Sequence, residues 1–213
     1  MIIGILNQKG GVGKTTLSLS IAHQLNRINN SKVLVVDSDP QQSSLNWSEV
    51  RERTPPFDVI GFSKKSLHRD LPSIAVNYDF IIIDGPPRVT EVARSCIMAS
   101  DIIVVPCTPS PYDIWASSET LTLITESKVY KEKLKYVFAI NRKIINTAIG
   151  RDVTSALQEL DAPVLQSHVC QRVIYAETAA SGLTVFDLEP EGKAAQEIVS
   201  LVNEVIAFFN SDR

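Results

Sequence analysis

Short runs of apolar, mostly β-branched residues alternate with longer amphipathic segments along this chain. Most runs are apolar at consecutive positions, which is typical of strands buried on both faces of a sheet. The runs predict strands at residues 2–6, 33–36, 59–62, 80–83, 102–105, 136–140 and 164–169. The segments between them predict helices at residues 14–28, 42–52, 90–99, 114–129, 148–160 and 194–209.

The regular alternation of strand and helix predicts an α/β fold. This order builds right-handed strand–helix–strand units, and such units give a largely parallel, twisted sheet with helices on both faces. In the last predicted helix, apolar residues recur at the three- and four-residue spacing of a face that packs on a sheet. No shift of composition divides the chain, so we expect residues 1–213 to form a single domain.

The composition is that of an ordinary globular protein. Of the 213 residues, 44% are hydrophobic and 21% are charged, which excludes a disordered chain. The sequence has no apolar run of about 18 residues and no basic N-terminal leader, so we expect a cytoplasmic protein without a membrane span. The three cysteines lack a Cys-x-x-Cys pair, which argues against a disulfide framework, a zinc site or an iron–sulfur site. Because the net charge is −3, contact with nucleic acid requires a local basic patch.

A glycine-rich segment, NQKGGVGKTT at residues 7–16, joins the first predicted strand to the first predicted helix. In this setting glycines let backbone N–H groups turn inward around a phosphate, and the helix N-terminus adds a partial positive charge. Lys14 then supplies a charge to the β- and γ-phosphates of ATP, and the Thr15 hydroxyl can bind Mg²⁺. The expected nucleotide contacts are Gly10, Gly11, Val12, Gly13, Lys14, Thr15 and Thr16.

Lys9 is a second lysine at the rim of this loop, and the preceding Gln8 replaces the glycine of the general phosphate-loop pattern. Lys14 repels Lys9 unless an anion lies between the two side chains. The segment resembles the deviant Walker A box of the ParA/MinD family of ATPases. The resemblance implies that Lys9 crosses a dimer to the triphosphate bound by the partner subunit; an exposed, solvated lysine is the alternative.

Three aspartates follow predicted strands. Asp37 and Asp39 come after residues 33–36, and Asp84 ends the apolar run at residues 80–83. Open α/β sheets bind ligands at the carboxyl ends of their strands, and alternation places Asp37 and Asp39 on one side if their strand continues. Asp84 has the Walker B pattern of an acid close to Mg²⁺. The family resemblance implies that Asp39 orients the attacking water and that Asp37 belongs to the metal and loop network; solvated turn residues are the alternative.

The resemblance extends in order over nearly the whole chain. It is best to the small ParF-like partition ATPases, which lack an N-terminal helix-turn-helix domain. Asn141 and Arg142 follow the sixth predicted strand, where related proteins meet the adenine base; for Asn141 an Asx turn is the alternative. The resemblance implies a homodimer that sandwiches two ATP–Mg²⁺, and it leaves open whether the dimer polymerises.

The resemblance also implies a positioning switch with weak ATPase activity. The ATP dimer would bind DNA without sequence preference, and a ParB-like or small adaptor protein would stimulate hydrolysis to segregate a plasmid or other intracellular cargo on the nucleoid. The candidate DNA contacts are basic residues late in the chain, although each one singly is more often a solvated cation. These candidates are Lys143, Arg151, Arg172 and Lys193, together with Arg142.

Three other functions are weighed against this hypothesis. A MinD-like membrane-cycling regulator needs a terminal basic amphipathic helix, whereas the last predicted helix carries Glu197 and Glu204. An iron–sulfur carrier related to nitrogenase reductase needs paired cysteines, and Cys96 and Cys107 are more simply interpreted as core residues. A ligase needs a convergent site for a small acid, for which we identify no residues. The positioning ATPase is therefore the main hypothesis, with the MinD-like regulator as its alternative.

Overall fold

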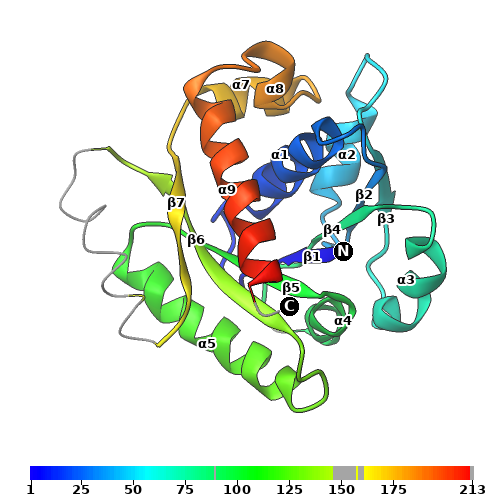
Figure 1. Cartoon of the computed structure of the whole chain (residues 1–213), viewed down its shortest axis with the longest axis vertical. Helices are drawn as coiled ribbons and strands as arrows, with labels where there is room; N and C mark the ends of the chain where they lie inside the picture. The colour runs from blue at the N-terminus through cyan, green and yellow to red at the C-terminus, as the bar shows by residue number, and fades with distance from the viewer. Residues whose placement is uncertain (89, 146–156, 158–160, 212–213) are drawn as a thin grey trace.

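A parallel β-sheet forms the centre of the structure, and helices cover both of its faces (Figure 1). The computed structural model describes residues 1–88, 90–145, 157 and 161–211. The strands are β1 (Ile2–Ile5), β2 (Val33–Asp37), β3 (Asp58–Gly61), β4 (Phe80–Asp84), β5 (Ile102–Cys107), β6 (Lys135–Lys143) and β7 (Val164–Cys170). The helices are α1 (Lys14–Arg27), α2 (Ser43–Glu49), α3 (Leu67–Ala75), α4 (Glu91–Ala99), α5 (Pro111–Lys128), α7 (Ile174–Ala180), α8 (Val185–Leu188) and α9 (Lys193–Asn210).

The strands lie in the order β3-β2-β4-β1-β5-β6-β7, and neighbouring strands run parallel. From β1 the chain crosses to β2 and the edge strand β3, returns to β4 beside β1, and then continues on the other side of β1 through β5, β6 and β7. The carboxyl ends of the strands beside such a switch point are where open α/β sheets bind ligands. The loops after β1, β2, β4 and β6 therefore share one edge of the sheet.

Alternation along each strand divides the core into two layers. On one face, strand residues such as Ile3 and Val35 pack with residues of α1, α2, α8 and α9. On the other face, Leu34 and Ile83 pack with residues of α3, α4 and α5. Figure 1 shows α1 and α9 lying side by side over one face of the sheet. Because both faces are buried, the strands are apolar at consecutive positions, as the sequence indicated.

The predicted α/β fold with a largely parallel sheet is confirmed, and each predicted strand is present. The predicted helices at residues 14–28, 42–52, 90–99, 114–129 and 194–209 correspond to α1, α2, α4, α5 and α9. The helix expected at residues 148–160 lies outside the described residues, apart from residue 157. Over the part of the chain that the structure describes, no helix combines the length and the apolar character needed to cross a membrane.

The sequence pattern did not predict three helices, and each has a local reason. In α3, Pro72 lies inside the helix, where proline removes a backbone hydrogen-bond donor and usually ends or kinks a helix. Its apolar residues Leu67 and Leu71 are nevertheless fully buried against the sheet. The other two, α7 and α8, have seven and four residues, too few to establish a helical period.

Candidate functional site

The loop between β1 and α1 has the backbone shape of an anion cradle. Gly11 and Gly13 adopt positive φ angles of 79° and 91°, which favour glycine, and Gly13 precedes the first residue of α1. A Cβ atom added at Gly10 or Gly11 would meet nothing within 4 Å, and both glycines line a cavity, so the loop borders open space. The N-terminus of the 14-residue α1 points its free N–H groups at this space.

Lys14, the first residue of α1, folds back over the loop. Its Nζ donates a hydrogen bond to the carbonyl oxygen of Lys9 at 3.1 Å, and the residue is 8% exposed. Burial lowers the pKa of Lys14 below 10.5, while the nearby carboxylates of Asp84 and Asp39 act in the opposite direction. The lysine is therefore held in the cradle, beside the acids and next to the N-terminus of α1.

The side chain of Lys9 contacts the start of α5 in this structure, across a cavity that the loop residues Gly10, Gly11 and Val12 also line. Its ammonium group pairs with a carboxylate oxygen of Asp113, near the start of α5. The second carboxylate oxygen of Asp113 accepts a hydrogen bond from the hydroxyl of Thr108. The side chain of Asp113 is 2% exposed, whereas that of Lys9 is 39% exposed. Lys9 is thus a partly solvated cation that is tied by one buried acid, and it is free to exchange that partner.

Asp84 and Asp37 are the last residues of the adjacent parallel strands β4 and β2, and they lie side by side as register partners. Both are almost completely buried. Asp84 accepts hydrogen bonds from the hydroxyl groups of Ser44 at 2.7 Å and Ser18 at 3.2 Å. Burial raises the pKa of Asp84 from 3.8 to about 6, and hydrogen bonds from Ser44, Thr15 and Ser18 counteract part of that rise. The pair concentrates acidic groups beside the first turn of α1.

Asp37 organises the segment that leads into α2. It accepts backbone hydrogen bonds from Asp39 at 3.1 Å, Ser44 at 2.8 Å and Leu45 at 3.0 Å. Burial raises the pKa of Asp37, and these three bonds lower it. The strand ends at Asp37, so the strand continuation that would align Asp37 and Asp39 does not occur. Asp39 instead lies in the following turn, partly exposed, where it accepts a bond from the N–H of Gln41 at 2.9 Å.

Asn141, near the end of β6, is tied to the phosphate loop. Its Nδ2 donates to the carbonyl oxygen of Val12 at 2.7 Å, and a Cβ on Gly13 would lie 2.4 Å from that nitrogen. The neighbouring Arg142 is exposed and adopts a φ of 54°. Both residues line a cavity of about 840 Å³ that also reaches Thr16 and Tyr175. That Asn141 and Arg142 contact an adenine base remains a prediction. Their position beside the phosphate loop and the cavity supports it.

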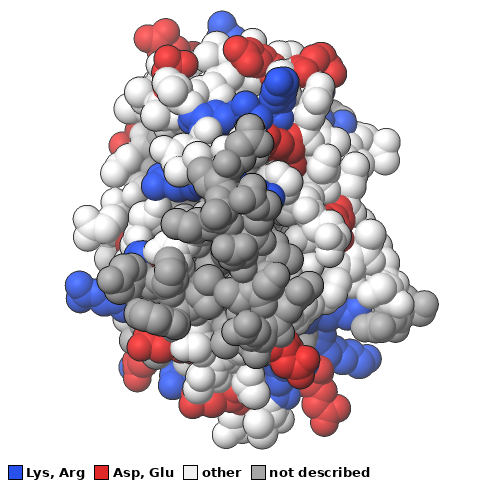
Figure 2. Space-filling view, turned by 90° about the vertical axis from the view of Figure 1, so that its left-hand side faces the viewer, with Lys and Arg blue, Asp and Glu red and all other residues white. Residues whose placement is uncertain are grey.

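Among the candidate DNA-contacting residues, Arg142 and Arg172 line the same cavity, and the charges of Lys143 and Arg172 both act on Cys170. Arg172 pairs with Glu197 of α9 at 2.6 Å, and this interaction raises the pKa of Arg172. Lys143 ends β6 and is partly exposed, whereas Lys193 begins α9 and is exposed. Arg151 lies outside the described residues. In Figure 2, basic and acidic side chains are interspersed over the visible part of this side of the molecule.

The structure adds residues that the sequence did not single out. Asp113 holds Lys9, and the hydroxyl groups of Ser18 and Ser44 hold Asp84. No sequence motif marks these partners, because isolated serines and aspartates occur throughout the chain and the contacts are long-range. Asp113 carries one local signal: it lies in the first turn of α5, shortly after Pro111, and acidic residues are favoured in the first turn of a helix.

The chemistry of the edge suits a phosphate group with a hard divalent cation. Hydroxyl and carboxylate oxygens from Thr15, Asp37 and Asp84 lie beside a cationic loop, and such oxygens are the ligands of Mg²⁺. Within the described ranges, no group of three or more His, Cys, Asp or Glu side chains is arranged to hold a metal alone.

Comparison with known proteins identifies relatives of nearly the same length. The chain is 32% identical over 209 residues to the maintenance of carboxysome distribution protein A of Halothiobacillus neapolitanus, which covers 96% of this chain and 95% of that protein. Apo McdA from Cyanothece has a TM-score of 0.80 at 17% identity, covering 96% of this chain and 98% of that one. The septum site-determining protein MinD of Pyrococcus horikoshii OT3, complexed with Mg-ADP, has a TM-score of 0.78 at 20% identity. The match covers 100% of this chain and 98% of that one.

A family profile matches most of the chain. The matched residues, 3–185, include the phosphate loop, the three aspartates and Asn141, and the profile is described as the CobQ/CobB/MinD/ParA nucleotide binding domain. The match covers well over half of the sequence, and the fold agrees with that of the structural neighbours. The chain therefore belongs to the CobQ/CobB/MinD/ParA family of nucleotide-binding domains.

Proposed function

We propose that this chain is an ATP-dependent positioning ATPase. Two copies bind two ATP–Mg²⁺ in a sandwich dimer, and the dimer binds DNA without sequence preference. A stimulating partner protein then accelerates slow ATP hydrolysis and so moves an intracellular cargo. The observation that carries the proposal is the phosphate cradle with Lys14 folded over it, at the same sheet edge as three aspartates.

The residues at this edge fit ATP and Mg²⁺. The triphosphate would lie against the N–H groups of the loop, with Lys14 against the β- and γ-phosphates. Thr15 and Asp84 would hold the metal, directly or through water, with Asp37 in the metal and loop network; the hydrogen bonds that join these residues support this assignment. Bound Mg²⁺ neutralises charge that develops on the phosphates during transfer.

Asp39 is the residue that we assign to the attacking water. It is partly exposed in the turn after β2, and its charge acts on Lys14. A carboxylate in this place can accept a hydrogen bond from water and align it with the γ-phosphate. Asp37 and Asp84 are less suited to this task, because backbone and hydroxyl donors already occupy their oxygens.

Lys9 provides the link between nucleotide and dimer. Its side chain is 39% exposed and lies outside its own cradle, so a triphosphate on a second subunit offers it a stronger anionic partner than Asp113. The dimer would then persist while the triphosphate persists. Loss of the γ-phosphate on hydrolysis would release it.

The DNA-binding, partner and localisation parts of the proposal rest on the family. A relative over nearly the full length is named for the distribution of carboxysomes, so a protein compartment joins plasmids among the cargo that the proposal covers. A dimer doubles any basic patch, which gives salt-dependent contacts to DNA phosphates despite a net charge of −3 per chain. We expect a ParB-like or small adaptor protein as the stimulating partner, and a location on the nucleoid.

Binding of non-specific DNA with and without nucleotide tests the function. A gel shift with ATP and not with ADP, together with ATP turnover that DNA and a partner increase, would support the proposal. Sedimentation with anionic liposomes in ATP would favour the membrane-cycling alternative instead. The apolar face of α9, including Ile198, Leu201 and Val205, is buried on the sheet, which argues against its use as a membrane anchor.

A further inference from the structure

Ser44 links the two buried aspartates of the site. Its hydroxyl donates to Oδ2 of Asp84 at 2.7 Å, and its backbone N–H donates to Oδ2 of Asp37 at 2.8 Å. The residue is 0% exposed, so neither bond competes with bulk water. Among the hydrogen bonds described for Asp37 and Asp84, Ser44 is the donor that the two share.

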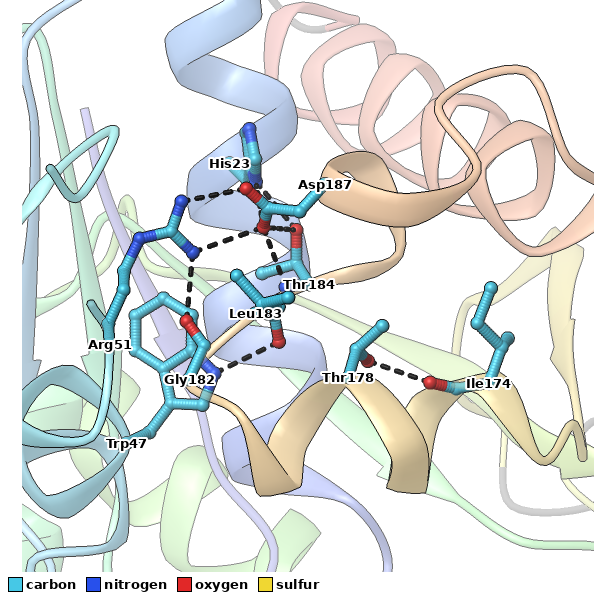
Figure 3. Close-up of polar contacts among 9 residues, drawn as sticks. All are labelled: His23, Trp47, Arg51, Ile174, Thr178, Gly182, Leu183, Thr184 and Asp187. Carbon is cyan, nitrogen blue, oxygen red and sulfur yellow. Dashed lines mark hydrogen bonds and ion pairs between the residues drawn. The ribbon is translucent and has the colours of Figure 1, made fainter. Parts of the chain in front are cut away.

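The position of Ser44 depends on α2, and α2 is fixed at its far end (Figure 3). The Nε1 of Trp47 donates to the carbonyl oxygen of Leu183 at 3.0 Å. Arg51, just beyond the helix, donates to the carbonyl oxygen of Gly182 at 2.8 Å and forms two bonds to Asp187 at 2.7 and 3.1 Å. These contacts fix α2 relative to the segment that joins α7 to α8, and they limit how far Ser44 can move.

The carboxylate of Asp84 is therefore held from two sides. Ser18, in α1, donates to Oδ1 at 3.2 Å, and Ser44, in α2, donates to Oδ2. The bond to Ser44 is the shorter one and comes from outside the phosphate-loop helix. Removal of the Ser44 hydroxyl would leave Oδ2 without this donor, so the orientation of the carboxylate would be held only by the hydroxyl groups of Ser18 and Thr15, both from α1.

We propose that Ser44 is a positioning residue for the divalent cation, acting through Asp84. This inference rests on the proposed function, in which Asp84 holds Mg²⁺ directly or through water. Partners that orient metal-binding carboxylates commonly change metal affinity when they are removed. Ser44 would serve Mg²⁺ without contacting the nucleotide.

The test is equilibrium titration of Mg²⁺ into protein with fluorescent ADP, which needs no catalysis. For Ser44→Ala we expect the Mg²⁺ concentration at half-saturation to rise about tenfold. The affinity for ADP in EDTA should stay within about twofold of wild type, because the phosphate loop is untouched. The matched control is Ser48→Ala, since the Ser48 hydroxyl donates only to the carbonyl of Leu45 in the same helix among the contacts described.

The outcomes separate this inference from the proposed function. Wild-type protein that binds no nucleotide would contradict the proposed function itself. A normal wild type with the same Mg²⁺ dependence for Ser44→Ala and Ser48→Ala would overturn the role of Ser44. Equal weakening of ADP binding with Mg²⁺ and with EDTA would also overturn it, since that is the effect of a structural defect. If Ser44→Ala does not fold, Ser44→Cys retains the volume with a weak donor, and the same criteria apply.

Discussion

The ammonium group of Lys9 forms an ion pair with the buried carboxylate of Asp113 in its own chain. Asp113 lies in the first turn of α5, and the hydroxyl of Thr108 occupies its second oxygen. The lysine that we assign to the partner's triphosphate therefore has an acidic partner within its own chain. Under the proposed function, dimer formation would exchange the Asp113 carboxylate for a phosphate group as the partner of Lys9.

Replacement of Lys9 by alanine should separate nucleotide binding from dimerisation. We expect Lys9→Ala to bind ADP within about threefold of wild type, because Lys14 and the loop N–H groups are retained. The ATP-dependent dimer should be lost, since the cation that crosses to the partner is absent. Size-exclusion chromatography with light scattering measures this, and a dimer of normal stability in ATP would contradict the crossing role.

Lys14 should be needed for binding itself. Its Nζ lies in the cradle, 3.1 Å from the carbonyl oxygen of Lys9, and carries the charge nearest to the bound phosphates. We expect Lys14→Ala to weaken ATP binding by about 100-fold, the effect of removing a charged partner of about 3 kcal/mol. Calorimetry measures the affinity, and the exposed Lys133→Ala is the control. Unchanged affinity for Lys14→Ala would show that the loop does not bind phosphate.

Asp39 should affect turnover more than binding. We expect Asp39→Ala to retain ATP affinity and to hydrolyse ATP about 100-fold more slowly, because the water loses its acceptor. The ATP dimer should then last correspondingly longer. Single-turnover hydrolysis and dimer lifetime measure the two effects, and wild-type turnover would move the water-positioning role to another residue.

His23 should make the folded state sensitive to acid. Burial lowers the pKa of His23 from 6.5 to about 4; the carboxylate of Asp187 opposes this shift, and Arg51 and Arg27 add to it. The unfolded chain takes up a proton below about pH 6.5, whereas the folded chain does so only near pH 4, so acidification through this window favours unfolding. We expect a loss of about 2 kcal/mol in the free energy of unfolding between pH 7 and pH 5.

Urea unfolding at the two pH values measures this loss. His23→Gln keeps a polar side chain near Thr184, whose hydroxyl lies 2.6 Å from Nδ1 of His23, and cannot gain a proton. The variant should therefore lack most of the dependence between pH 7 and pH 5. An equal dependence in both proteins would assign it to other groups.

Gly182 should be intolerant of a side chain. It adopts a φ of 63°, and a Cβ would lie 2.7 Å from both the carbonyl oxygen of Trp47 and the N–H nitrogen of Arg51. We expect Gly182→Ala to destabilise the fold by about 2–4 kcal/mol in urea unfolding. Gly10→Ala, where a Cβ would meet nothing within 4 Å, is the control for stability. Equal stability of Gly182→Ala and Gly10→Ala would contradict this prediction, since it would mean that the backbone at Trp47 and Arg51 shifts at little cost to make room for the added Cβ.

The sequence determined those features that depend on neighbouring residues. Strand and helix order follows from apolar runs and periods; the predicted strands are confirmed, and so are the predicted helices at residues 14–28, 42–52, 90–99, 114–129 and 194–209. The sequence also predicted the position of the phosphate loop, because its glycines, Lys14 and Thr15 are close together within one strand–loop–helix unit. Helices of four and seven residues, and one that contains Pro72, carried too weak a local signal.

Only the tertiary structure decided which distant residues meet. Ser44 and Asp84 are 40 residues apart and come together because β2 and β4 are neighbours in register. In the sequence, Glu197 and Glu204 served only as an argument against a basic terminal helix; in the structure Glu197 accepts a hydrogen bond from the backbone N–H of Cys170, and Glu204 accepts one from that of Ser167. Sheet order and helix placement bring these groups within hydrogen-bond distance, and residue pattern alone does not contain that information.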